Sequence, residues 1–184
     1  HLERVLVAVK NGILQSKKAN IKLPVFLKIS PDIKEDVLEK IVKIANKKKI
    51  TGLIISNTTI DRNNNLSSQN LKEVGGLSGK PLFIKSTNIL SMANKIIKKN
   101  NYSLHLIAVG GVYNSQTTYA KILCGASLVQ LYTSLTYEGP LIADKIIKGL
   151  LDLMKRDKIT HFDQIRGIID NPEDALNIAT NGFN

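Results

Sequence analysis

Residues 24–56 read PVFLKISPDIKEDVLEKIVKIANKKKITGLIIS, and this stretch decides the fold class. It opens with a short apolar run, Pro24–Ile29, of the kind found in buried strands. Residues 33–48 then follow helical spacing, with apolar positions on one face at Ile33, Val37, Leu38, Ile41, Ile44 and Ala45. A second apolar run, Leu53–Ser56, closes the unit. The pattern predicts strand, helix and strand, the repeating unit of a parallel sheet.

The same alternation continues down the chain. It predicts strands at 104–109 and 127–131 and helices at 87–99, 115–123 and 140–155. Four successive strand–helix pairs indicate an α/β protein with parallel strands buried on both faces. Either a doubly wound sheet or part of a (β/α)8 barrel fits this order. A complete barrel has eight strand–helix pairs in about 250 residues, so the four pairs of this chain would supply roughly half of one.

Two segments lie outside this pattern. The polar stretch 58–74 is too long for an ordinary connection, and loops of that length are usually functional or mobile. Residues 156–184 are expected to form a loosely held C-terminal extension, which leaves 1–155 as the main unit.

Composition excludes several classes of protein. One cysteine, Cys124, and three scattered histidines permit no disulfide framework and indicate no metal site. We read Cys124, at the end of a predicted helix, as a small buried residue. The net charge is +11, but the lysines of 40–49 and 95–99 alternate with apolar residues as solvated helix faces do. With no Trp and 5% aromatic residues, few side chains can stack on bases, so no nucleic-acid partner is expected.

Polar residues follow the first two predicted strands, where ligands bind in both architectures. Lys28 lies inside an apolar run, and either meets an anionic or electron-rich group or reaches solvent from the strand end. Ser56, Asn57 and Thr58 follow the second strand. They offer donors and acceptors to a planar amide-bearing ligand, although a turn with local caps would use the same residues.

Glycine-rich turns supply sharper candidates. The segment GGLSGKP at 75–81, which includes Gly79, lets the backbone approach a ligand closely. Gly110 and Gly111 directly follow the third strand, and Tyr132 and Thr133 follow the fourth. Barrels commonly bind phosphate on the loops after strands seven and eight. If the four strands are strands five to eight, both pairs fall on those loops.

Together these segments resemble one family. PVFLKISPD (24–32), GLIISNTTIDR (52–62), GGLSGKPL with KST (75–87), VGGV (109–112) and GASLVQLYTSLTYEGP (125–140) occur in the order and spacing of class 2 dihydroorotate dehydrogenases. These are FMN-dependent, quinone-reducing (β/α)8 barrel enzymes. The resemblance covers about residues 1–155, and residues 1–20 resemble a helix of the barrel.

The resemblance implies roles for the matching residues. Lys28 would lie against the FMN ring, Ser56 and Gly79 would contact the flavin, and Asn57 and Thr58 would hydrogen-bond dihydroorotate or orotate. The remaining candidates would bind the FMN phosphate: Gly110, Gly111, Tyr132 and Thr133.

It also implies what the chain would not contain. The family's reaction takes a proton and a hydride from dihydroorotate to give orotate for pyrimidine biosynthesis, and passes electrons from FMN to a quinone. Its catalytic serine would lie upstream of His1, as would the segment that docks on the membrane. We therefore expect a fragment, or a split or truncated product, that is inactive alone and belongs to a protein peripheral to an inner membrane.

Two alternatives stay open. Another FMN barrel, such as a tRNA dihydrouridine synthase, would explain the positive charge but fits the SNTTIDR and GGLSGKPL segments less well. A non-catalytic basic module would bind nucleic acid or anionic lipid in a strongly salt-dependent way, without a flavin.

Overall fold

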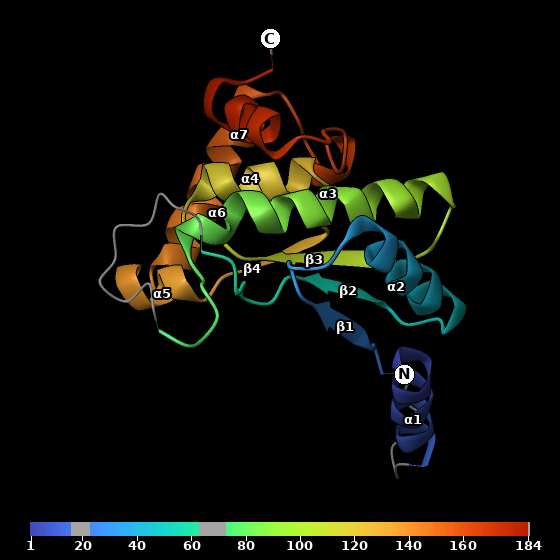
Figure 1. Cartoon of the computed structure of the whole chain (residues 1–184). Coiled ribbons are helices and arrows are strands. Elements are labelled where there is room, and N and C mark those ends of the chain that lie inside the picture. The colour runs from blue at the N-terminus through green and yellow to red at the C-terminus, as the bar shows by residue number, and fades with distance from the viewer. Residues whose placement is uncertain (16–22, 63–72, 184) are drawn as a thin grey trace.

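The computed structural model describes residues 1–15, 23–62 and 73–183, which are built around a four-stranded parallel sheet (Figure 1). Neighbouring strands pair in chain order: β1 (Phe26–Ile29), β2 (Gly52–Ile55), β3 (His105–Val109) and β4 (Leu128–Gln130). Each strand lies within the segment predicted for it or one residue outside it. The prediction of an α/β protein with parallel strands is confirmed.

Helices connect the strands as the periodicity predicts. They are α2 (Glu35–Lys47) between β1 and β2, α3 (Phe83–Lys99) before β3, α4 (Ser115–Leu123) before β4, and α6 (Ile142–Arg156) after it. Helix α3 begins at Phe83 rather than Thr87, because the 3-10 turn η1 (Lys80–Leu82) leads straight into it. The short helix α5 (Thr133–Glu138) was not predicted.

The main core lies between one face of the sheet and the helices. Alternate residues of the central strands, among them Leu53, Ile55 and Ala108, are fully buried there against α3 and α4. Figure 1 shows α3 and α4 above the sheet. This core fixes where the strands end, and so where the loops that follow them meet.

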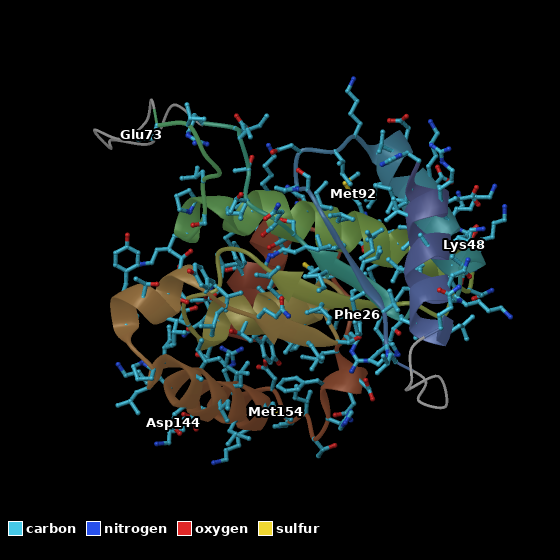
Figure 2. The ribbon with its side chains drawn as sticks, turned by 90° about the horizontal axis from the view of Figure 1, so that it is seen from below. Phe26, Lys48, Glu73, Met92, Asp144 and Met154 are labelled. Atoms are coloured by element: carbon cyan, nitrogen blue, oxygen red, sulfur yellow. The ribbon has the colours of Figure 1, made fainter. Side chains whose placement is uncertain are left out.

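The opposite face of the sheet is not covered in the same way. Lys28, Ile54, Ile107 and Leu128 pair in register on that face, which is turned towards the viewer in Figure 2 and carries Phe26 as well. Leu128 is 62% exposed. The prediction that every strand is buried on both faces is therefore wrong for the described residues, because their helices cover one face. In a closed barrel such a face would line the interior.

The C-terminal segment is packed rather than loose. Helix α7 (Pro172–Asn181) lies on α4 and α3 as a further layer, with Ala175 and Ala179 fully buried (Figure 1). The Ser91 hydroxyl donates to the Asp170 carbonyl at 2.6 Å. The expectation of a loosely held extension is wrong, because small residues let α7 approach α4 closely. This contact could not be predicted from the sequence of so short and polar a helix.

Helix α1 (Leu2–Gln15) packs beside α2. Leu6 is buried, and Lys10 Nζ donates to the Lys48 carbonyl at 2.8 Å. Of the helix expected over 1–20 and the polar stretch 58–74, residues 16–20 and 63–72 lie outside the described residues.

The lysines predicted to form solvated helix faces do so: Lys40, Lys43 and Lys47 on α2, and Lys95, Lys98 and Lys99 on α3, are all exposed. In the described part of the chain, no helix has the length and apolar character needed to cross a membrane.

Candidate functional site

One cavity lies at the carboxyl ends of the four strands. Its volume is about 340 Å³. It is lined by every residue that the sequence analysis singled out for binding: Lys28, Ser56, Asn57, Thr58, Gly79, Gly110, Gly111, Tyr132 and Thr133. Residues as far apart in the chain as Lys28 and Thr133 therefore meet at one place.

Lys28 approaches the cavity from β1. Its side chain stands on the uncovered face of the sheet, in register with Ile54 of β2. No described residue accepts a hydrogen bond from the Lys28 ammonium or pairs with it as an anion. A cation without a protein partner at a cavity wall is suited to an anionic or electron-rich ligand.

The end of β2 is fastened to both neighbouring strands. The backbone N–H of Ser56 donates to the Val109 carbonyl at 2.9 Å, and that of Asn57 donates to the Ile29 carbonyl at 2.8 Å. Ser56 is buried, and its hydroxyl donates to the Asn57 carbonyl at 2.9 Å. The hydroxyl proton of Ser56 is thus used locally, which leaves its oxygen to accept from a ligand.

Asn57 and Thr58 are exposed at the cavity. Within the described ranges, the side chains of both lack a hydrogen-bond partner. Gly76 comes so close to Thr58 that a Cβ there would meet the Thr58 hydroxyl oxygen at 1.8 Å. The backbone of the 75–79 loop therefore holds Thr58 in place. The side-chain amide of Asn57, beside it, remains available to a ligand.

The turn after β3 requires its two glycines. Gly110 and Gly111 have φ values of 112° and 75°, which side chains rarely adopt. A Cβ on Gly111 would meet the Phe83 Cα at 2.3 Å, because the turn packs directly on the start of α3. No described acceptor takes the backbone N–H of Gly111 or of the next residue, Val112. Two adjacent free amides form a small anion-binding concavity.

The turn after β4 closes the cavity from the other side. The Thr133 hydroxyl donates to the Ser78 hydroxyl at 3.0 Å, and a Cβ on Gly79 would lie 3.1 Å from the Thr133 methyl. The glycine-rich loop and the start of α5 are therefore in contact. Tyr132 is 79% exposed at the rim.

An ionic cluster supports the loops behind the cavity. The Asp32 carboxylate accepts from Lys85 Nζ at 2.6 Å, from the Thr59 hydroxyl at 2.5 Å and from the Ile60 backbone at 2.9 Å. Burial would raise the pKa of Asp32, but these hydrogen bonds and the charge of Lys85 outweigh it and lower the pKa. Lys85 also pairs with Asp61 at 3.0 Å.

Sequence reasoning missed part of this arrangement. It assigned no role to Ser78, which contacts Thr133, or to Lys85, which joins two loops. Both lie inside motif segments that were recognised, at 75–82 and 85–87. Charged or hydroxyl residues within such segments were the available signal.

Comparison with known proteins decides the family. The family model described as dihydroorotate dehydrogenase matches residues 6–154, most of the chain. The chain belongs to the dihydroorotate dehydrogenase family.

Relatives agree on the quinone-dependent type. A protein of Allorhizobium ampelinum named dihydroorotate dehydrogenase (quinone) is 42% identical over 152 residues, or 83% of this chain and 41% of the relative. A Brucella anthropi protein of the same name is 42% identical over 165 residues, or 90% and 44%. The resemblance to class 2 dihydroorotate dehydrogenases is confirmed, and the chain spans less than half the length of these relatives.

Solved structures of the family share the fold. Dihydroorotate dehydrogenase of Eimeria tenella in complex with ferulenol superposes with a TM-score of 0.81 at 30% identity, covering 91% of this chain and 48% of that one. Its ligand-free form gives a TM-score of 0.83. The parallel α/β sheet is therefore of the TIM-barrel type that this family uses.

Proposed function

We propose that the protein is a quinone-dependent dihydroorotate dehydrogenase whose cavity binds FMN and the pyrimidine ring of dihydroorotate. One observation carries the proposal: nine residues singled out from the sequence alone line a single cavity at the carboxyl ends of the strands. Parallel α/β folds bind ligands at that edge. The family assignment supports the same conclusion.

The residues present fit an FMN phosphate. The backbone amides of Gly111 and Val112, which no described acceptor takes, provide donors, and a Cβ at Gly111 would displace the turn that presents them. The Thr133 hydroxyl, which donates to Ser78 in this structure, lies at the same rim and would turn its proton towards the phosphate. Backbone amides and hydroxyls bind phosphate without requiring an arginine.

Lys28 and the end of β2 fit the flavin ring and the substrate. The Lys28 ammonium, which has no partner among the described residues, would stabilise negative charge that develops beside it. Asn57 and Thr58 would donate to and accept from the carbonyl and N–H groups of a pyrimidine, since an amide side chain offers both. Ser56 would accept a hydrogen bond from the ligand through its hydroxyl oxygen. Gly79, which has no side chain, would let the ligand approach the backbone of the loop.

FMN, when bound, would take hydride from dihydroorotate and supply electrons to a quinone. The chain's own residues would orient the substrate and balance charge. Residues 1–155 would contribute strands five to eight of the barrel, with 156–184 as a C-terminal extension. The protein would act at an inner membrane, where its quinone is dissolved.

The two alternatives have less support. A tRNA dihydrouridine synthase would belong to a different family from the one whose model matches residues 6–154. A basic binding module would account for the lysine-rich faces of α2 and α3, but not for the nine candidate residues that line one cavity.

Ligand binding to the purified protein at its natural length tests the proposed site. Heat-released flavin should have the mass of FMN, and orotate should perturb its visible spectrum. Asn57→Ala should raise the orotate dissociation constant about tenfold, the effect of losing roughly 1.4 kcal/mol of hydrogen bonding. The matched control is Asn181→Ala, at an exposed position on α7. Equal orotate affinity in both variants would remove Asn57 from the site.

A further inference from the structure

Lys121 of α4 is a lysine enclosed entirely within the protein. Its relative exposure is 0%, which places it among the largest fully buried side chains. Its Nζ donates to the Ser86 hydroxyl at 2.6 Å and lies 5.2 Å from the centre of the Phe83 ring. In the described part of the chain no carboxylate pairs with it.

Such a residue is costly for a fold to keep. An ammonium transferred from water to the interior without a counter-ion loses several kcal/mol of solvation. One hydroxyl and one aromatic face compensate only part of that loss. Burial lowers the pKa of Lys121 to about 7, opposed only by a weak effect of Cys124. The lysine is therefore poised between its neutral and charged forms.

The two contacts of Lys121 are the residues on which the Gly110–Gly111 turn rests. The Ser86 hydroxyl accepts from Lys121, and its single proton lies within reach of two carbonyls, that of Gly110 at 3.0 Å and that of Phe83 at 3.1 Å. Gly111 packs on the backbone of Phe83. Lys121 thus lies one side chain behind the turn whose free amides line the cavity.

We propose that the Lys121 ammonium is the buried counter-charge for a phosphate monoester bound at the Gly110–Gly111 turn, and that it acts through Ser86 as a positioning residue. The proposal rests on the proposed function in that the phosphate is taken to be that of FMN. A phosphate carries about −1.5 to −2 charge near neutral pH. Brought to the front of the turn, it would stabilise the charged form of Lys121 behind it.

Few other groups near Lys121 titrate. On its own helix the neighbour is Cys124, whose pKa burial raises to about 12. From α3 the facing residues are Phe83 and Ser86, which do not ionise in this range. Asp170 and Glu173, next to and on α7, act on Cys124. The phosphate itself loses its second proton with a pKa of about 6, which would raise affinity as the pH rises. A fall in FMN affinity with rising pH would therefore report on Lys121.

The test compares FMN with riboflavin, which lacks the phosphate. Dissociation constants are measured by flavin fluorescence on the apoprotein of natural length between pH 6.5 and 8.5. Wild-type affinity for FMN should fall about tenfold as pH rises, because binding then requires a proton on Lys121, while affinity for riboflavin should stay level. Lys121→Met should bind FMN about tenfold more weakly at pH 6.5, and its affinity should not fall as the pH rises.

Two further measurements make the result decisive. Lys98→Met removes a lysine from α3 that bonds Gly167 instead, and should leave the FMN-to-riboflavin ratio unchanged. A wild-type FMN affinity that is flat with pH overturns the proposal without any variant, as does an unchanged ratio in Lys121→Met. If the wild type binds no flavin, inorganic phosphate separates the two claims. If phosphate raises the Tm of the wild type but not that of Lys121→Met, the role of Lys121 as counter-charge is supported and the FMN site is overturned. If phosphate changes neither Tm, both the counter-charge and the FMN site are overturned.

Discussion

The Asp32 carboxylate and the Lys85 ammonium form an ion pair of 2.6 Å that joins the segment after β1 to helix α3. Because Asp32 also accepts from Thr59 and Ile60, the same carboxylate fixes the segment after β2. Lys28 and Asn57, the residues proposed to face flavin and substrate, flank these anchors. The Asp32–Lys85 ion pair therefore adds a side-chain link between these segments to the backbone hydrogen bond that Asn57 donates to Ile29.

Replacing that carboxylate should lower stability in a pH-dependent way. The folded-state pKa of Asp32 lies below its ordinary value of 3.8, so its contribution is present above that pH and is lost as the pH falls below it. Asp32→Asn should therefore lower the free energy of unfolding by about 1–2 kcal/mol at pH 7. The difference from the wild type, measured by urea unfolding, should shrink towards pH 3. A difference that stays constant to pH 3 would exclude the charge as its source.

A methyl group at Gly111 should disrupt the turn after β3. Gly111→Ala would place a Cβ 2.3 Å from the Phe83 Cα, and the alanine would also have to adopt the positive φ of this turn. We expect a loss of more than about 3 kcal/mol in unfolding free energy, or of bound flavin. Gly139→Ala is the matched control: its φ is also 75°, but nothing lies within 4 Å. That variant should lose only the conformational cost of about 1–3 kcal/mol and keep the flavin. Equal effects would mean that packing on α3 is unimportant.

Helix α7 should behave as part of the core. Ala179→Leu inserts a larger side chain at a fully buried position and should lower the free energy of unfolding by about 1–3 kcal/mol. Asn177→Leu, on the exposed side of the same helix, should change it by less than about 0.5 kcal/mol. Flavin content should be unaffected in both. If Ala179→Leu is as stable as Asn177→Leu, the packing of α7 on α4 contributes little.

Cys124 should be chemically inert in the folded protein. It is fully buried, and burial raises the pKa of its thiol to about 12, so almost no thiolate forms at neutral pH. Iodoacetamide at pH 8, followed by peptide mapping, should leave Cys124 unmodified until denaturant is added. Rapid modification of the native protein would contradict the burial of the α4 C-terminus.

The sequence predicted those elements whose local residue pattern matches their place in the fold. Short β-branched runs predicted the four strands, and the apolar face of 33–48 predicted α2, because buried parallel strands and amphipathic helices leave regular patterns. Lys28, Ser56 and Gly110 were found because ligands in this architecture gather at strand ends, so that polar residues there stand out.

Features that depend on contacts between distant segments were not predictable in this way. Ala175 and Ala179 are small residues whose burial appears only when α7 lies on α4. Lys121 reads as one more lysine on a polar helix, and only the packing of Phe83 and Ser86 around it shows that it is enclosed. Both are tertiary effects that periodicity in a short helix cannot convey.

The central claim is that this cavity holds a flavin reduced by dihydroorotate. The most direct test is the visible absorption spectrum of the protein, purified at its natural length, recorded anaerobically before and after dihydroorotate is added. We expect a flavin spectrum that bleaches on addition. A flavin that remains oxidised would contradict the proposed substrate, and a colourless protein of natural length would contradict the flavin site itself.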